Sequence, residues 1–291
     1  MSALKSNINP QKKGKRFRFD FLIIACVVIF ITCFVIYMFN GRLEPSSGAN
    51  NSPSQSTSDA GSKDGSTADA SSSEATTTVA TTTSPPVTSP VNPVPQSEAA
   101  TADYFNSCGF IGDSLTYGLK SYNLVPPKNV IASIGMNIAK IDTEVIDTAF
   151  GKVTALNAVK QLKPANVYIM LGSNGIAWLS NETMIQKYSG FIDSVRKELP
   201  NSKIYILSIP PVAVERETTT ESPIQNSAID SYNSELLKMA NSKGILFVDI
   251  NTALKNNKGK LDSSKAQKDG MHFQKDTYGV MVNYILTHIA K

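Results

Sequence analysis

The chain is poor in histidine, cysteine and tryptophan, and each shortage narrows the chemistry open to it. Its 291 residues include two histidines, three cysteines and one tryptophan. Cys26 and Cys33 lie inside a long apolar run, so only Cys108 remains outside it. This pattern excludes an intramolecular disulfide in the rest of the chain, and it excludes a zinc site built on cysteine spacing. We expect Cys108, which lies in a short apolar run, to be a small buried hydrophobic residue rather than a nucleophile.

The chain also lacks a basic stripe. Its formal net charge is +4 at pH 7, but the excess of positive charge is concentrated in the basic cluster Lys5–Arg18. The remainder of the chain is therefore close to neutral. A nucleic-acid-binding domain usually carries Lys and Arg gathered on one face, so nucleic acid is not expected as a partner.

One long hydrophobic run, Phe21–Phe39, follows the basic residues 1–20. It is long enough for a single membrane-spanning helix. The preceding positive charge predicts a cytoplasmic tail over residues 1–20 and an extracytoplasmic location for everything after residue 39. The alternative is a cleaved signal peptide, with Ser47-Gly48-Ala49 as a possible cleavage site. We favour an uncleaved anchor, because the run is long for a signal sequence and these small residues lie well beyond its end.

Residues 40–103 contain no aromatic side chain and are dominated by Ser, Thr, Ala, Pro, Gly and Asn. A segment of this composition cannot bury enough apolar surface to fold, so a disordered linker is predicted. Its Thr- and Pro-rich part, Thr76–Pro95, has the composition of an O-glycosylated stalk. Such a linker would hold a domain away from the membrane, in or near a cell wall.

Residues 104–291 alternate between short Val- and Ile-rich runs and longer amphipathic stretches. The continuous apolar runs predict strands that are buried on both faces. They are Cys108–Ile111, Val130–Ile134, Val167–Leu171, Ile204–Ile209 and Ile245–Ile250. The stretches expected to form helices are Val153–Leu162, Glu182–Leu199, Ser227–Ser242 and Asp276–Ile289, with Asn181 as a possible cap of the second. Alternation of this kind predicts an α/β domain with a parallel sheet and helices on both sides.

Gly112-Asp113-Ser114 ends the first of these apolar runs, and a helix is expected from Leu115. A strand, a sharp turn and a helix would present Ser114 at the carboxyl end of a parallel strand, where open α/β sheets hold their sites. The free N–H groups at a helix N-terminus favour developing negative charge. The alternative is an N-cap serine in a loop.

The two histidines differ in context. His288 lies in the last predicted helix and is expected at the surface or an edge. His272 lies in a glycine-bearing loop before that helix, and Asp269 precedes it by three residues. A short turn can place the carboxylate against the imidazole, so that the other ring nitrogen faces the serine. Together with Ser114, these residues predict a nucleophile, a base and the group that orients the base.

An acyl-transfer site also needs hydrogen-bond donors aimed at the position where negative charge develops. The backbone N–H of Ser114 is one candidate. Gly135, after the second predicted strand, and Asn174, after the third, supply a backbone N–H and a side-chain amide. All three follow successive strands, as one shared site would require.

In this order of motifs the chain resembles the SGNH (GDSL-type) hydrolases, over essentially all of residues 104–291 and none of the first hundred. The resemblance rests on four blocks, namely Gly112-Asp113-Ser114, Gly135, Gly172-Ser173-Asn174 and Asp269-x-x-His272. It implies a flavodoxin-like three-layer α/β/α sandwich with a five-stranded parallel sheet. It also implies Ser114 as nucleophile, His272 as base, Asp269 as its orienter, and Ser114, Gly135 and Asn174 as the oxyanion hole.

One position departs from the family pattern. Gly175 stands where the third block often has an Asp, and this variant looks like the extracytoplasmic domains of peptidoglycan O-acetyltransferases. The leading hypothesis is a membrane-anchored serine esterase that removes acetyl or similar short acyl groups from wall glycan or other carbohydrate, without cofactor or metal. The alternatives are an O-acetyltransferase that works with a separate multispan partner, a non-catalytic wall-binding module, and a lipase.

Two further features remain open between roles. Trp178, the only tryptophan, is expected in the core or the cleft wall, with stacking on a sugar as the alternative. The segment Pro210–Asn226 is polar, charged and long, and it follows the carboxyl end of a predicted strand. It is interpreted as a solvated loop or as a border of the substrate cleft.

Overall fold

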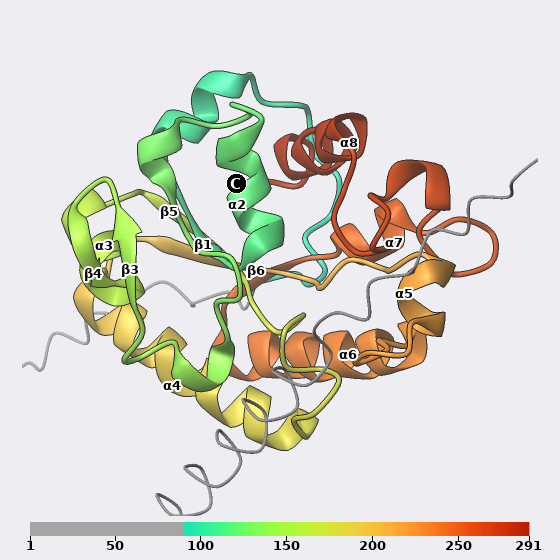
Figure 1. Ribbon diagram of the computed structural model, residues 1–291. Helices are drawn as coiled ribbons and strands as arrows, with labels where there is room; N and C mark the ends of the chain where they lie inside the picture. The colour runs from blue at the N-terminus through green and yellow to red at the C-terminus, as the bar shows by residue number, and fades with distance from the viewer. Residues whose placement is uncertain (1–89, 291) are drawn as a thin grey trace, which may run out of the picture. The chain divides into compact units, whose positions relative to one another are not determined.

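A five-stranded sheet forms the centre of the folded part of the chain (Figure 1). The computed structural model describes residues 90–290. The strand order is β2-β1-β5-β6-β7, and every neighbouring pair is parallel. The strands are β1 (Cys108–Gly112), β2 (Val130–Ala132), β5 (Asn166–Met170), β6 (Lys203–Leu207) and β7 (Leu246–Val248). The prediction of an α/β domain with a five-stranded parallel sheet is thus confirmed.

Helices cover both faces of this sheet. Figure 1 shows α4 and α6 on one side and α2 and α8 on the other. The helices are α2 (Ser114–Ser121), α3 (Ala155–Leu162), α4 (Asn181–Glu198), α5 (Val214–Thr218), α6 (Asn226–Lys243), α7 (Ile250–Leu254) and α8 (Lys275–Leu286). Short 3-10 turns complete the chain at η1 (Ala102–Ser107), η2 (Pro127–Asn129), η3 (Ile138–Lys140) and η4 (Ser263–Lys265).

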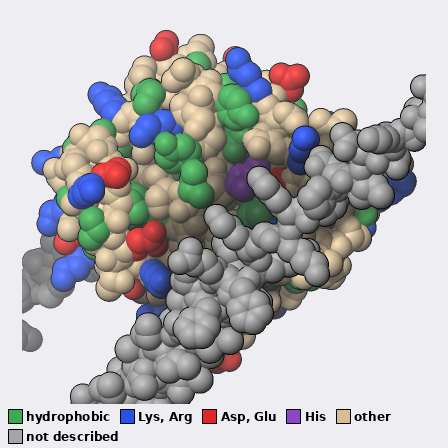
Figure 2. All heavy atoms as spheres, viewed as in Figure 1, with side chains coloured by type: hydrophobic (Ala, Val, Ile, Leu, Met, Phe, Trp, Pro, Cys, Tyr) green, Lys and Arg blue, Asp and Glu red, His purple; other side chains and the backbone are tan. Residues whose placement is uncertain are grey.

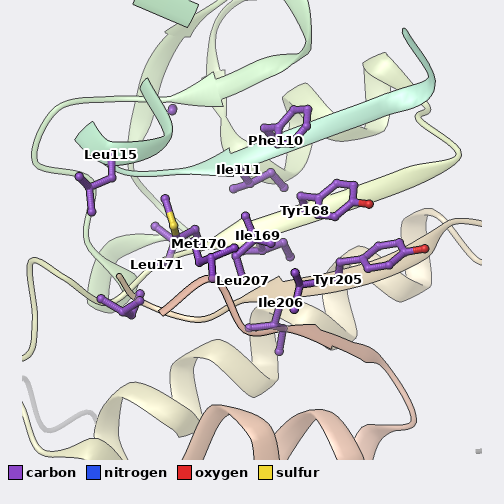
Figure 3. Close-up of a cluster of buried hydrophobic side chains, with 14 of the residues drawn as sticks. Phe110, Ile111, Leu115, Tyr168, Ile169, Met170, Leu171, Tyr205, Ile206 and Leu207 are labelled. Atoms are coloured by element: carbon purple, nitrogen blue, oxygen red, sulfur yellow. The ribbon is translucent and has the colours of Figure 1, made fainter. Parts of the chain in front are cut away.

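Aromatic side chains line up across three adjacent strands in the core (Figure 3). Phe110 is paired with Tyr168 in the register of β1 and β5, and Tyr168 is paired with Tyr205 in the register of β5 and β6. Their rings stack with centroid separations of 5.3 Å and 4.5 Å. Aromatic pairs of this kind stabilise a sheet beyond the area they bury, and they fix its register.

The order of the strands determines where a site can form. From β1 the chain moves to β2 on one side, and it later returns to β5 on the other side. The loops after β1 and β5 therefore leave the sheet next to each other at the point where the winding direction reverses. In open α/β sheets, ligands bind at this switch point, outside the carboxyl ends of the strands.

Local structure departs from the sequence-based expectation in two places. Residues expected to begin a helix at Val153 belong instead to an antiparallel hairpin, β3 (Val145–Thr148) and β4 (Gly151–Thr154). Thr154 caps the helix that follows, because its side chain accepts a hydrogen bond from the N–H of Asn157. The cap of α4 is Ser180 rather than Asn181, since the Ser180 hydroxyl accepts from the N–H of Thr183.

The folded region begins earlier than the boundary predicted at residue 104. Val94 is buried, and the side chain of Asn92 binds the backbone of β7 and of the residue before it. Composition alone had assigned these residues to the linker. The predicted tail (1–20), the predicted membrane segment (21–39) and most of the predicted linker lie outside the described residues. Within residues 90–290, no helix combines the length and the hydropathy needed to cross a membrane.

Candidate active site

Ser114 is the first residue of α2, directly after the turn that ends β1. The turn is tight at Gly112, where an added Cβ would lie 2.6 Å from the carbonyl oxygen of Met170 on the neighbouring strand. Asp113 caps the helix, and its Oδ1 accepts a hydrogen bond of 3.0 Å from the N–H of Leu115. Ser114 therefore lies where the helix dipole and the free N–H groups of the first turn favour negative charge.

The predicted partners of Ser114 meet it in space, although they lie far along the chain. His272 Nε2 is 2.8 Å from Ser114 Oγ, and His272 Nδ1 is 2.5 Å from Asp269 Oδ2. Figure 2 shows a histidine at the surface of the face viewed, and His272 itself is partly exposed, with 32% of its side chain accessible. The histidine side chain is therefore positioned both to exchange a proton with the serine and to meet solvent or substrate.

The Asp269 carboxylate is fixed through both of its oxygens. Besides its contact with the imidazole, Asp269 accepts hydrogen bonds of 3.0 Å at Oδ1 from the N–H groups of Met271 and His272. Partial burial opposes ionisation, but these hydrogen bonds and the imidazole outweigh it and lower the pKa of Asp269. An ionised carboxylate at Nδ1 holds the imidazole in the tautomer whose Nε2 can accept a proton from the serine.

The predicted oxyanion donors lie on the loops after β1, β2 and β5, which are neighbours in the sheet. Gly135 has a positive φ of +82°, and an added Cβ there would meet nothing within 4 Å, so this backbone borders open space. Within the described part of the chain, no hydrogen-bond acceptor contacts the N–H of Ser114 or of Gly135. Both donors are thus available to an incoming oxygen.

Asn174 links two of these loops. Its side-chain Nδ2 donates to the backbone carbonyl of Met136 at 3.0 Å. Its backbone carbonyl accepts from Nδ2 of Asn137 at 2.9 Å. The second proton of the Asn174 amide remains for a ligand. Asn137 was given no role by sequence reasoning, and its contribution becomes visible only when the two loops are placed side by side.

A second unexpected pair includes the residue that directly precedes the serine. Asp113 is fully buried, and its Oδ2 accepts a hydrogen bond from the hydroxyl of Ser173. Loss of solvent raises the pKa of Asp113 to about 6, although the hydrogen bonds from Ser173 and Leu115 oppose the rise. Both residues stand inside motifs that the sequence singled out, but nothing in the sequence showed that they bind each other.

The remaining candidate residues have mixed outcomes. Cys108 is fully buried, as expected, and burial raises the pKa of its thiol to about 12. His288 was expected at the surface or an edge, but it is buried and its ring stacks on Tyr284. Trp178 is not part of the core: 63% of its surface is exposed. Among residues 90–290, no cluster of three or more His, Cys, Asp or Glu side chains is arranged to hold a metal ion.

The segment Pro210–Asn226 is more ordered than a solvated loop. It contains α5, and the N–H of Ala213 donates to the carbonyl of Gly270 at 2.8 Å. Glu217 then ties α5 to its surroundings, because its carboxylate accepts from Asn226 and pairs with Lys260. The segment thus supports the loop that carries Asp269 and His272.

Comparison with known proteins identifies the family of the chain. Residues 110–280 match the GDSL-like Lipase/Acylhydrolase family, which covers more than half of the chain. The chain is a member of this family, whose enzymes hydrolyse esters. A search of functionally curated proteins gives no match.

Several solved structures are similar over the folded region. A GDSL-like lipase from Bacteroides thetaiotaomicron is 17% identical, with 63% of this chain and 87% of that chain covered and a TM-score of 0.46. A carbohydrate esterase family 3 protein from Talaromyces cellulolyticus is 15% identical, covering 61% and 93%, with a TM-score of 0.43. LAE5, an alpha/beta hydrolase from the metagenome of Lake Arreo, is 14% identical, covering 67% and 96%, with a TM-score of 0.45.

Proposed function

We propose that this protein is a serine esterase that removes acetyl or similarly short acyl groups from carbohydrate, with Ser114, His272 and Asp269 as its catalytic residues. The observation that carries the proposal is the continuous hydrogen-bonded chain from Ser114 Oγ through the imidazole of His272 to Asp269. A serine with a purely structural role would not need an imidazole within hydrogen-bond distance of its hydroxyl. It would also not need an ionised carboxylate that orients this imidazole.

The geometry supports a two-step mechanism. His272 Nε2 takes the proton of Ser114 as Oγ attacks the ester carbonyl, and the N–H groups of Ser114 and Gly135 with the Asn174 amide hold the oxyanion. His272 then gives its proton to the departing alcohol, which leaves an acyl-serine. Water, deprotonated by the same imidazole, attacks that ester and releases the carboxylic acid together with the free serine.

The apolar residues that adjoin the site leave little internal space. A cavity of about 10 Å³ is lined by Leu115, Ser173 and Met271, which are sequence neighbours of Ser114, Asn174 and His272, but none of those three residues lines it. Such a volume holds about one water molecule, so it cannot take up a long hydrocarbon chain. We therefore expect the acetate ester to be turned over far faster than the octanoate ester.

The full-length chain and its Ser114→Ala variant should be compared on 4-nitrophenyl acetate, butyrate and octanoate, and on O-acetylated oligosaccharides. Hydrolysis by the wild type, with a loss of at least roughly 10³-fold in the variant, is expected. Asn174→Ala should lose on the order of 10²–10³ in kcat. Equal rates for the wild type and Ser114→Ala would refute the proposal. Transfer of acetyl to an added glycan in place of hydrolysis would identify the O-acetyltransferase instead.

We also propose that residues 21–39 anchor the protein in a cell membrane with the esterase domain outside. The proposal is supported by the apolar length of the run and by the positive charge before it. Immunoblots of membrane and medium fractions test it directly. A shortened, freely soluble product would show that the segment is a cleaved signal peptide.

A further inference from the structure

Trp178 is a large apolar side chain that the fold leaves in solvent. It lies in the turns that follow β5, where the N–H groups of Trp178 and Leu179 bind the carbonyl of Gly175 at 3.0 Å and 2.8 Å. Its ring is also held, because Nε1–H donates to the carbonyl of Asn174 at 2.7 Å. The indole is held in a fixed orientation but contributes little buried apolar area to the fold. An exposed apolar surface often marks a binding site.

The hydrogen bond of Trp178 connects it to the oxyanion hole. The Asn174 carbonyl that accepts from the indole also accepts from Asn137, and the Asn174 amide donates to Met136. One residue therefore couples the tryptophan to the loop after β2. A ligand resting on the indole would be positioned relative to the same amide that is proposed to hold the oxyanion.

A second exposed apolar side chain lies on the loop that is linked in this way. Ile134 directly precedes Gly135, and 77% of its surface is exposed. Ile134 and Trp178 thus stand on the two loops that supply oxyanion donors beside Ser114.

We propose that Trp178 and Ile134 form the surface that binds the sugar ring carrying the ester. This inference rests on the proposed esterase function and adds the part of the site that recognises the alcohol side of the substrate. A pyranose has an apolar C–H face that packs on an aromatic ring, while its hydroxyl rim stays hydrated or binds polar groups. Tryptophan offers the largest such face at a low cost in conformational entropy.

The surroundings favour a sugar over a lipid chain. Ile134 and Trp178 are exposed side chains on two different loops, whereas a fatty chain needs a continuous apolar groove. The cavity lined by Leu115, Ser173 and Met271 is too small to supply one, at about 10 Å³. The occupant that fits is a flat ring with one apolar face.

Because Trp178 is the only tryptophan of the whole chain, its fluorescence reports on this surface alone. The full-length Ser114→Ala protein should be titrated with acetylated xylotetraose and with tetra-N-acetylchitotetraose. A saturable change in emission with at least one of them is expected. No change with either sugar, in a preparation whose wild-type counterpart hydrolyses 4-nitrophenyl acetate, would overturn the inference. A change caused only by dioctanoyl phosphatidylcholine would overturn it in favour of a lipid.

Kinetics give a second readout. Trp178→Ala should raise KM for acetylated xylotetraose roughly three- to tenfold relative to KM for 4-nitrophenyl acetate, and Trp178→Phe should keep most of the wild-type ratio. Val145→Ala is a matched control, since Val145 is also an exposed apolar residue but lies on β3. Equal ratios in Trp178→Ala and Val145→Ala would contradict the inference. A wild type without any ester hydrolysis would instead contradict the proposed function, and the fluorescence titration would be unaffected.

Discussion

The contribution of Asp113 to the free energy of unfolding depends on pH. The carboxyl is fully buried, and its pKa rises from 3.8 to about 6, so the folded state binds a proton more tightly than the unfolded state does. Its favourable contribution is fully present below pH 3.8 and is lost as the pH rises through 6. The difference corresponds to about 3 kcal/mol of unfolding free energy.

Replacing this carboxyl should therefore remove part of the pH dependence of stability. Asp113→Asn keeps an acceptor for the N–H of Leu115 and offers Ser173 a donor in place of an acceptor. We expect the stability of the wild type, measured against this variant, to fall by about 2 kcal/mol between pH 4 and pH 7. Urea unfolding followed by circular dichroism at both pH values gives the difference. A pH-independent difference would mean that Asp113 is ionised throughout.

Glycine is needed at position 270 because the backbone of α5 lies close to it, and not only because its φ is positive. Its φ is +69°, and an added Cβ would lie 2.6 Å from the backbone nitrogen of Arg216 on α5. Gly270→Ala should displace the loop of Asp269 and His272, and small displacements of catalytic groups cost on the order of 10²-fold in rate. Measured kcat on 4-nitrophenyl acetate checks this.

Gly259 provides the matched control for that substitution. It has nearly the same φ, +72°, but an added Cβ would meet nothing within 4 Å. Gly259→Ala carries only the strain of a left-handed backbone, about 1–2 kcal/mol of stability, without an effect on kcat. If both variants lose the same activity, the contact between Gly270 and α5 does not position the site.

At the scale of elements, the sequence predicts those that bury a continuous apolar stretch. All five sheet strands lie where Val- and Ile-rich runs were found, because burial on both faces requires such runs. The hairpin β3–β4 has no such signal: its strands are short and mostly exposed, with only Ile146 buried. Helix α5 buries no residue at all, so its polar sequence resembles a loop. It is held by contacts with distant residues, which no local pattern records.

The same limit applies to the site. Ser114, Asp269 and His272 could be placed by motif and by the position of each loop after a strand. The bond between Asp113 and Ser173 and the link between Asn137 and Asn174 join residues separated by 60 and 37 positions. The amino-acid types at these positions are common in turns and caps, so their pairing could not be inferred from the sequence.

The N-terminus of α4 shows the difference between a plausible and an actual cap. Ser180→Ala removes the hydroxyl that accepts from the N–H of Thr183 and should cost about 0.5–2 kcal/mol. Asn181→Ala removes only an exposed side-chain bond to Ser231 and should stay within about 0.5 kcal/mol of the wild type. Thermal unfolding of the two variants distinguishes them. A larger loss in Asn181→Ala would restore the cap expected from the sequence.

At the scale of the whole domain, residues 92–100 form a strap across its surface. The N–H of Val94 donates to the carbonyl of Phe247 in β7, and the N–H groups of Ser97 and Ala100 donate to carbonyls at the end of α8. The strap thus fastens the chain that precedes the domain to the last strand and the last helix. The amino-acid composition does not reveal the strap, because a single buried valine and one asparagine provide much of its attachment to the domain.

Substitutions within the strap can show whether it stabilises the domain. Asn92→Ala leaves the N–H of Phe247 and the carbonyl of Ile245 without their partner, which should cost about 1–3 kcal/mol. Val94→Ala removes two buried methyl groups and should cost about 2 kcal/mol. Val91→Ala is the control, because Val91 is exposed and its truncation should change stability by less than about 0.5 kcal/mol.

Urea unfolding of the full-length proteins measures all three strap variants against the wild type, with circular dichroism as the signal. The strap residues bind the edge of the sheet formed by β7, so their loss should lower the midpoint of the main transition rather than add a separate one. If Asn92→Ala and Val94→Ala unfold at the same midpoint as Val91→Ala, the strap contributes nothing to the fold. The stable domain would then begin near Tyr104, as the composition of the chain suggests.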